Sequence, residues 1–182
     1  MENQGRKLTI GALLHDVGKL LYRTNDGRSH SISGYEFLKE QGIEDEEILN
    51  QIKFHHGKML AKAQIPDNDL SYITYWADNV AAGADRRTND ESYEWGYDKY
   101  VPLASIFNIL NDNHQNYSYD MQAIYDDGKP NNPKETGGSY SEGTYNGILK
   151  ELKQCLSAVA LTEEYVNSLL SVLEATQSFV PS

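Results

Sequence analysis

The sequence has one cysteine, Cys155, in 182 residues, so no disulfide can form within the chain. No run of apolar residues is long enough to cross a membrane, and the N-terminal residues lack the apolar segment of a secretory signal. Both absences favour a protein of the cytoplasm. A chain of this length can bury one sizeable core, or one core with a smaller satellite element.

Basic residues are also scarce: 16 lysines and arginines stand against 27 acidic residues, which gives a net charge of −11. A surface with this balance repels a phosphate backbone, so a broad basic face for nucleic acid is excluded. Chemistry on a phosphate group would then need a local site, the charge of a metal ion, or a larger assembly.

Apolar residues recur at helical spacing over most of the chain, which predicts an all-α fold. Residues 1–110 are expected to form the catalytic core. Residues 111–147 are rich in Asn, Asp, Gly, Ser and Tyr, so we expect a polar, partly flexible excursion with at most a short strand pair. Residues 148–182 return to helical spacing and are predicted to form a helical hairpin that packs on the core.

The adjacent His15 and Asp16 lie in the stretch LLHDVGKL at residues 13–20, whose apolar spacing predicts one continuous helix. An unpaired carboxylate on a helix that is covered by its neighbours is energetically expensive. A divalent cation that takes the imidazole nitrogen and the carboxylate oxygen as ligands removes that penalty. The alternative is a surface His and a surface Asp on an ordinary amphipathic helix.

Four more polar residues are candidate ligands. His30 follows a polar turn near the start of a helix, where its ring can point back over the first helix. His55 and His56 continue the apolar stripe of a helix predicted to run to Leu60, so at least one ring points inward. Asp78 lies on a long helix, beside a stripe expected to face the core. That stripe consists of Leu70, Ile73, Ala77, Val80, Ala81 and Ala84. The simpler readings are a loop histidine, satisfied core histidines and a half-exposed carboxylate.

Two other polar groups are expected to have no ligand role. Asp85 with Arg86 and Arg87 is predicted to form a local ion pair at the end of the long helix. His114 lies in the polar excursion, away from the other histidines in the sequence.

The six candidates come from helices that a compact all-α domain brings side by side, and together they supply ligands for two metal ions. They are His15, Asp16, His30, His55, His56 and Asp78. We expect Asp16 to bridge, with His15 and Asp78 on one ion and the three remaining histidines on the other. A ligand set this rich in nitrogen favours manganese, cobalt, nickel or iron over magnesium, with manganese the preferred candidate.

A site of this kind has a specific use on phosphate esters. Two metal ions lower the pKa of a shared water and hold a phosphoryl oxygen during in-line attack. Lys19, one helical turn beyond His15, is then placed to neutralise the charge that develops on the phosphate, so His15, Asp16 and Lys19 are the candidate catalytic residues. The alternative for Lys19 is a lysine on a helix surface.

Three segments resemble the N-terminal HD nuclease domain of the large subunit of type III-A CRISPR (Csm) effector complexes. They are GALLHDVGK at residues 11–19, FHH at residues 54–56, and YITYWADNVAAGADRR at residues 72–87. The likeness extends over most of residues 6–110 and returns in SFVPS at residues 178–182. His-Asp alone occurs in every HD phosphohydrolase, whereas the combination of segments is specific.

This resemblance implies a permuted HD fold and a metal-dependent nuclease that degrades single-stranded DNA once the complex has bound target RNA. It implies as partners the palm domains of the same large subunit, expected to follow Ser182, and the other effector subunits with guide RNA and target RNA. The palm domains of that family make cyclic oligoadenylates with a Gly-Gly-Asp-Asp motif, which this sequence lacks. The isolated domain is expected to be monomeric and weakly active, because its acidic surface helps little in capturing a strand.

The permutation has one consequence for the ligand set. Unpermuted HD enzymes carry an extra histidine on a helix before the His-Asp pair, and permutation would move that helix to the C-terminus. No histidine occurs between residues 115 and 182, so one ion is expected to be completed by water or to bind more weakly.

Two other functions are compatible with the same residues. One is an HD phosphohydrolase acting on small nucleotides, which would release phosphate from mononucleotides. The other is an inactive HD scaffold that only docks the rest of a complex, for which replacing Asp16 would leave DNA degradation unchanged.

Overall fold

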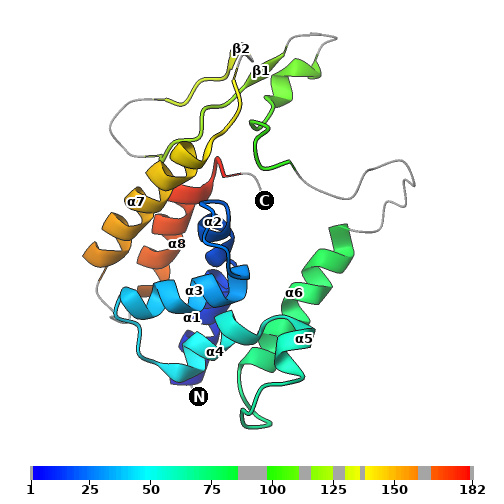
Figure 1. Cartoon of the computed structure of the whole chain (residues 1–182), viewed down its shortest axis with the longest axis vertical. Coiled ribbons are helices and arrows are strands. Elements are labelled where there is room, and N and C mark those ends of the chain that lie inside the picture. Colours follow the sequence, from blue (N-terminus) through cyan, green and yellow to red (C-terminus); the bar gives the residue numbers. More distant parts are fainter. Residues whose placement is uncertain are drawn as a thin grey trace. The chain divides into compact units, whose positions relative to one another are not determined.

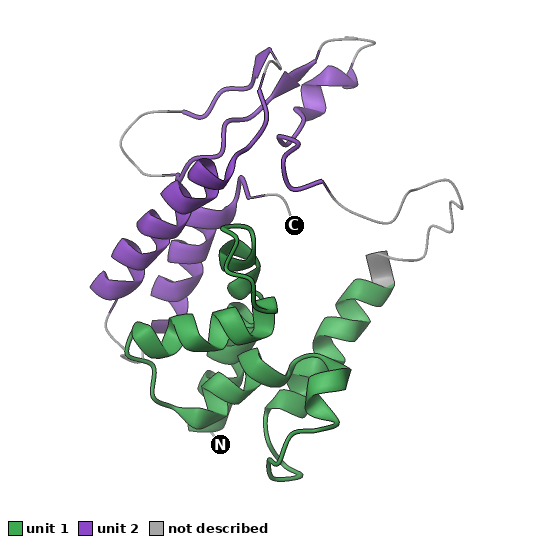
Figure 2. Ribbon diagram, in the orientation of Figure 1, with its two compact units in different colours: residues 1–95 green, residues 96–182 purple. Residues whose placement is uncertain are grey.

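The computed structural model of the chain describes six stretches. They are residues 2–85, 98–110, 116–124, 130–135, 138–159 and 165–180. Within them the chain is mostly helical, with one two-stranded sheet, which confirms the predicted all-α fold class (Figure 1). The chain divides into two compact units, Met1–Trp95 and Gly96–Ser182 (Figure 2). The domain limits expected at residues 110 and 147 stay a prediction.

In its described residues, 2–85, the first unit forms six helices that succeed one another along the chain. They are α1 (Glu2–Leu14), α2 (Gly18–Tyr22), α3 (His30–Glu40), α4 (Glu46–Phe54), α5 (Gly57–Leu60) and α6 (Ser71–Asp85). Helix α4 packs against α1, α3 and α6, and it buries Leu49 and Ile52 completely. Asp45 caps α4 by accepting a hydrogen bond from the Glu47 backbone N–H, at the end where acidic side chains are favoured.

Helices α2 and α3 approach each other at two glycines. A Cβ atom at Gly18 would lie 1.8 Å from the backbone oxygen of His30 and 2.6 Å from the backbone nitrogen of Gly34. Only a residue without a side chain fits there, because backbone atoms on both sides leave no room to move. This approach places the start of α3, and with it His30, directly against the turn that precedes α2.

The predicted first helix and the helix predicted to run to Leu60 are not continuous. Helix α1 ends at Leu14 and α2 begins at Gly18, so His15 and Asp16 lie in the turn between them. The helix that begins at Glu46 likewise ends at Phe54. Val17 keeps helical backbone angles, so the apolar residues keep their helical spacing across the first break. The break is therefore not visible in the sequence pattern. At the second break His56 is extended, with φ −101° and ψ 134°.

The expected core stripe of α6 was largely wrong. Ile73 and Val80 are 50% and 71% exposed, whereas Ser71 and Thr74 are buried. Leu70, which directly precedes α6, is buried as expected. The hydroxyls of Ser71 and Thr74 face inward because they donate to Asp69 Oδ1 and Gln51 Oε1, which removes the penalty of burying them.

The second unit contains the remaining described elements. They are the 3₁₀ turn η1 (Ile106–Asn108), the strands β1 (Tyr117–Ser118) and β2 (Lys134–Glu135), and the helices α7 (Glu142–Ala158) and α8 (Tyr165–Gln177). The strands pair antiparallel, and α7 packs against α8. Helix α7 begins before residue 148 because Ser141 and Thr144 form a capping box at its start.

Some expectations concern parts of the chain that are not described. Arg86, Arg87 and His114 lie outside the described residues. Among the described residues, no helix is both long and apolar enough to cross a bilayer.

Candidate metal centre

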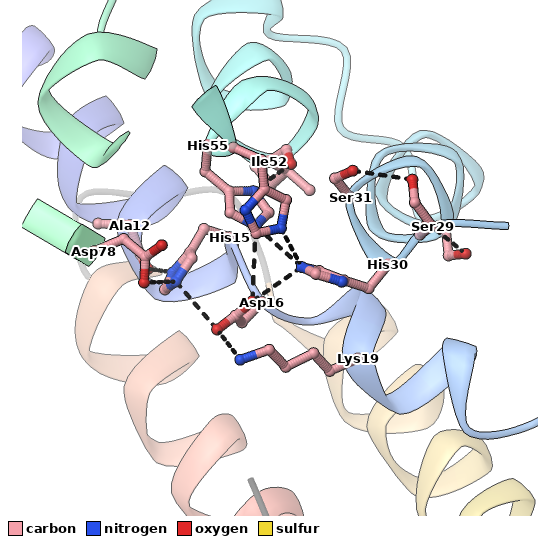
Figure 3. Close-up of polar contacts among 12 residues, drawn as sticks. Ala12, His15, Asp16, Lys19, Ser29, His30, Ser31, Ile52, His55 and Asp78 are labelled. Carbon is pink, nitrogen blue, oxygen red and sulfur yellow. Dashed lines mark hydrogen bonds and ion pairs between the residues drawn. The ribbon is translucent and has the colours of Figure 1, made fainter. Parts of the chain in front are cut away.

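The structure brings all six predicted ligands together in the first unit. Figure 3 labels all of them except His56. They form two groups, in each of which the ligand atoms all lie within 4.8 Å of one another. The imidazole group is His30, His55 and His56; the carboxylate group is His15, Asp16 and Asp78. Five of the six residues lie at helix ends or in turns, and Asp78 lies within α6.

Asp16 lies between the two groups. Its Oδ2 atom is 3.2 Å from Nε2 of His15, in its own group. Its Oδ1 atom is 3.6 Å from Nε2 of His30 and 3.8 Å from Nε2 of His55, both in the imidazole group. The two oxygens of one carboxylate therefore face different groups, as a bridging ligand would.

The imidazole group directs three ring nitrogens toward one another. Nε2 of His30 lies 2.7 Å from Nε2 of His56 and 3.2 Å from Nε2 of His55. Nδ1 of His55 lies 2.7 Å from the carbonyl oxygen of Ile52, which can only accept, so Nδ1 carries the proton and Nε2 presents a lone pair. A backbone carbonyl commonly fixes a metal-binding histidine in this form.

The carboxylate group contains a buried nitrogen that fits a cation. Nδ1 of His15 donates to the Ala12 carbonyl oxygen at 2.6 Å, which leaves Nε2 with a lone pair. This Nε2 is buried and has no hydrogen-bond partner among the described residues. It faces Asp16 Oδ2 at 3.2 Å and Asp78 Oδ1 at 3.6 Å. A lone pair beside two carboxylates is repulsive unless a proton or a cation lies between them, so these residues fit a metal ion.

The charges of His15 and Asp16 are coupled. Burial disfavours both charged forms, but their mutual attraction outweighs it. Asp16 therefore raises the pKa of His15, and the pKa of Asp16 falls well below its usual range because His15 and Lys19 stabilise the carboxylate. Asp16 stays ionised at every pH at which the protein would work, as a ligand for a cation must.

Two rings of the imidazole group, those of His55 and His30, favour the neutral form. Burial, followed by the charge of His56, lowers the pKa of His55 to about 4. The same two causes, in the same order, lower the pKa of His30. Neutral imidazole is the form that binds metals, so the site does not need to lose a proton from these rings at neutral pH.

Lys19 reaches the site from α2. Its Nζ atom lies 2.7 Å from Oδ2 of Asp16, and its side chain is 44% exposed. The amine therefore sits at the border between the buried carboxylate and solvent. An ion pair this exposed adds little to stability, at most about 1 kcal/mol.

The residue pattern did not single out Gln51 and Thr74. Gln51 lies on α4 four residues before His55, and Thr74 lies on α6 four residues before Asp78. Both are buried, and the Thr74 hydroxyl donates to the Gln51 side-chain oxygen at 2.7 Å. The sequence signal that could have indicated a buried Gln51 was its position between Ile48 and Ile52, on the apolar side of its helix.

The fold and the two ligand groups define the class of protein. Residues 2–83 match the family described as HD domain, so the chain contains an HD domain. A protein of Enterococcus italicus, "CRISPR system single-strand-specific deoxyribonuclease Cas10/Csm1 (subtype III-A)", is 33% identical over 196 residues, which cover 99% of this chain and 25% of that protein. The chain belongs with the N-terminal HD domains of the Cas10/Csm1 family.

Solved structures agree with this assignment. The crystal structure of Csm1 from T. onnurineus matches with a TM-score of 0.66 and 26% identity, over 97% of this chain and 24% of that one. Csm1 in a Csm1–Csm4 subcomplex of the type III-A CRISPR-Csm interference complex shares the fold, with a TM-score of 0.57 and 24% identity over 96% of this chain and 24% of that one. The chain spans about a quarter of the length of the curated relatives it matches.

Proposed function

We propose that this chain is a metal-dependent nuclease domain that hydrolyses phosphodiester bonds of single-stranded DNA in a type III CRISPR interference complex. The observation that carries the proposal is the buried Nε2 atom of His15, which faces two carboxylates and has no hydrogen-bond partner among the described residues. The name of the related Enterococcus italicus protein, a single-strand-specific deoxyribonuclease, supports the choice of substrate.

Each group of ligands would hold one divalent ion. His15, Asp16 and Asp78 would bind one, and His30, His55 and His56 the other, with Asp16 shared between them. The mixture of imidazole and carboxylate suits manganese best, with nickel or cobalt as alternatives. When bound, such ions activate water at neutral pH and polarise the phosphoryl oxygens.

The residues of the chain prepare the site for this chemistry. The carbonyls of Ala12 and Ile52 hold His15 and His55 with their Nε2 lone pairs directed into the site. The Lys19 amine lies at the solvent border and carries a positive charge. In our proposal it leaves Asp16 to contact the scissile phosphate, which orients the phosphate and offsets the negative charge that develops on it.

Capture of a DNA strand would depend on other parts of a larger protein. The chain carries a net charge of −11, which opposes the approach of a polyanion. We infer that the palm domains of the same large subunit and the other effector subunits, with guide RNA and target RNA, bring the strand to the site. Csm4 in the matched subcomplex is one subunit of this kind. The isolated domain is expected to be monomeric and slow.

A cleavage assay with matched variants tests the proposal. The full chain is incubated with Mn²⁺ and either labelled single-stranded DNA or mononucleotides, and cleavage is compared with phosphate release. Asp16→Asn preserves the size of the side chain and should abolish DNA cleavage. Asp120→Asn removes a carboxylate paired with Lys134 in the second unit and should change nothing.

Three results would overturn the proposal. Equal DNA degradation by Asp16→Asn and the unchanged chain would point to a contaminating nuclease or a scaffold role. Phosphate release from mononucleotides without DNA cleavage would point to a small-nucleotide phosphohydrolase. Cleavage that persists after chelation of all divalent ions would exclude metal dependence.

A further inference from the structure

The side-chain amide of Gln51 connects three helices beneath the candidate metal centre. Gln51 is fully buried. Its Nε2 atom donates to the backbone oxygen of Lys7 on α1 at 3.1 Å and to that of Glu47 on α4 at 2.8 Å. Its Oε1 atom accepts from the hydroxyl of Thr74 on α6 at 2.7 Å. Both amide protons and the amide oxygen are therefore paired, each in the buried interior of the first unit.

Helix α1 approaches this amide closely enough to exclude a side chain. A Cβ atom at Gly11 would lie 2.2 Å from the amide carbon of Gln51 and 2.4 Å from its Oε1. The amide could move aside only by giving up its hydrogen bonds to α1, α4 and α6. Gly11, Gln51 and Thr74 thus form one buried contact, which we call the amide layer.

The amide layer lies one helical turn before the ligands in each chain segment. Gly11 precedes His15, Gln51 precedes His55 and Thr74 precedes Asp78, each by four residues. Four residues of a helix correspond to about 400° of rotation and about 6 Å of rise, so residues at this spacing lie on one face. Asp78 shares α6 with Thr74, whereas His15 and His55 directly follow the last residues of α1 and α4. The same three segments that meet at the amide layer therefore meet again at the ligands.

We propose that Gln51 is a positioning residue, whose amide fixes the relative register of α1, α4 and α6 so that His15, His55 and Asp78 converge on the metal ions. This inference rests on the proposed function, since it assigns a role toward metals that the site is proposed to bind. Apolar contacts alone are non-directional and tolerate sliding between helices, whereas a fully paired buried amide specifies one arrangement. A metal site needs that precision, because ligands about 1 Å out of place bind poorly.

Thr74→Val is the informative substitution. It keeps the shape of the side chain and removes only the hydroxyl that joins α6 to Gln51. Thr176→Val is its matched control, because Thr176 is also a fully buried helical threonine whose hydroxyl donates one hydrogen bond, to the Val172 carbonyl at 2.7 Å. Thr74→Ser keeps the hydroxyl and serves as the conservative rescue.

The readout is metal binding rather than cleavage. The metal-free full chain is titrated with Co²⁺, and binding is followed by the visible absorption of the bound ion and by calorimetry. Asp78→Asn and His56→Ala identify which binding step belongs to which ligand group. Thr74→Val should weaken the binding step that Asp78→Asn removes, and the Kd of that step should rise by about 10-fold or more. This is the usual size of an effect from a residue behind the ligands. The step that His56→Ala removes should change less, and Thr176→Val and Thr74→Ser should bind Co²⁺ like the unchanged chain.

Gly11→Ala tests the same contact from α1 and retains all hydroxyl groups. It should weaken the same Co²⁺ step, and it carries the test if Thr74→Val does not fold. Identical Co²⁺ binding by Thr74→Val and Thr176→Val, or by Gly11→Ala and the unchanged chain, would overturn the positioning role and leave the proposed function intact. Absence of Co²⁺ binding by the unchanged chain would instead overturn the proposed function, and the positioning role with it.

Discussion

The Oδ1 atom of Asp16 lies 3.6 Å from Nε2 of His30, although the two residues are separated by a whole helix, α2. The distance is short because Gly18 allows α2 and α3 to approach until their backbones are in contact. This arrangement places a carboxylate from one ligand group against an imidazole from the other.

Asp16→Asn should weaken both metal-binding steps, because Asp16 is the residue whose oxygens face both groups. Asp78→Asn should weaken only one step, since the oxygen of Asp78 faces His15. We expect the loss of affinity for Asp16→Asn to exceed about 100-fold, the upper end of what residues behind the ligands contribute. Calorimetric titration of the metal-free chain with Mn²⁺ measures both changes. A loss confined to one step in Asp16→Asn would show that the carboxylate does not bridge.

Gly18→Ala should destabilise the fold and disturb the imidazole group. The added Cβ would overlap the His30 backbone oxygen, and forcing extra volume into a packed contact costs about 1–3 kcal/mol. Urea unfolding followed by circular dichroism gives the change. The matched control is Gly5→Ala in α1, where nothing lies within 4 Å of the added atom, and it should be neutral or stabilising by up to about 1 kcal/mol. Equal effects at the two glycines would contradict the close approach of α2 and α3.

The metal-free chain should lose stability as the pH falls from about 6.5 to about 4. The pKa of His55 is lowered from its ordinary value of 6.5 to about 4 in the folded state, so unfolding takes up a proton in this range. The contribution of His55 to the free energy of unfolding therefore has its full value above pH 6.5 and declines below it. Between pH 7 and pH 5 this contribution falls by about 2 kcal/mol. His30, whose pKa is also lowered, acts in the same direction, whereas His15, whose pKa is raised, opposes it.

The pH effect is measured by urea unfolding in a chelating buffer at pH 7, 6 and 5. His55→Asn removes the titrating ring and should flatten the dependence. If the free energy of unfolding of His55→Asn depended on pH as steeply as that of the unchanged chain, other groups would be responsible for the titration.

Binding of Mn²⁺ should stabilise the fold. A metal ion that binds only the folded chain stabilises it by about 2.7 kcal/mol at a free concentration of 100 times Kd. Thermal unfolding with Mn²⁺ and then with excess chelator measures the gain and its reversal. The double variant Asp78→Asn with His56→Ala removes one ligand from each group and should lose most of the gain. An equal rise in Tm for the double variant would place the Mn²⁺ elsewhere.

Lys19→Gln should reduce DNA cleavage by about 10-fold or more while the affinity for metal changes little. The amine is half exposed, so the pair with Asp16 contributes at most about 1 kcal/mol to stability. Its expected use is on the phosphate, where the removal of one stabilising contact commonly lowers the rate by this factor or more. The comparison variant is Lys7→Gln, which also removes a lysine paired with carboxylates, Asp45 and Glu47. Unchanged cleavage in Lys19→Gln would support the simpler reading of a surface lysine.

The residue types of the site could be recognised before any coordinates. Imidazole and carboxylate side chains in or beside apolar helical stretches are costly without a ligand. This cost, together with their placement on helices of one all-α domain, singled out His15, Asp16, His30, His55, His56 and Asp78. Helical spacing of apolar residues likewise predicted the fold class. Both inferences rest on local properties, the chemistry of a side chain and the period of a helix.

Other features depend on contacts between segments that are distant in the chain. The break after Leu14 is invisible in the residue pattern, because the turn keeps nearly helical angles at Val17. The inward face of α6 was misassigned because Thr74 is buried by its hydrogen bond to Gln51 rather than by hydrophobicity. The sequence by itself determined which atoms were available to hold metal ions. Tertiary packing decided that they meet, since only the approach of α1, α3, α4 and α6 brings Asp16 between the histidines and Asp78 toward His15.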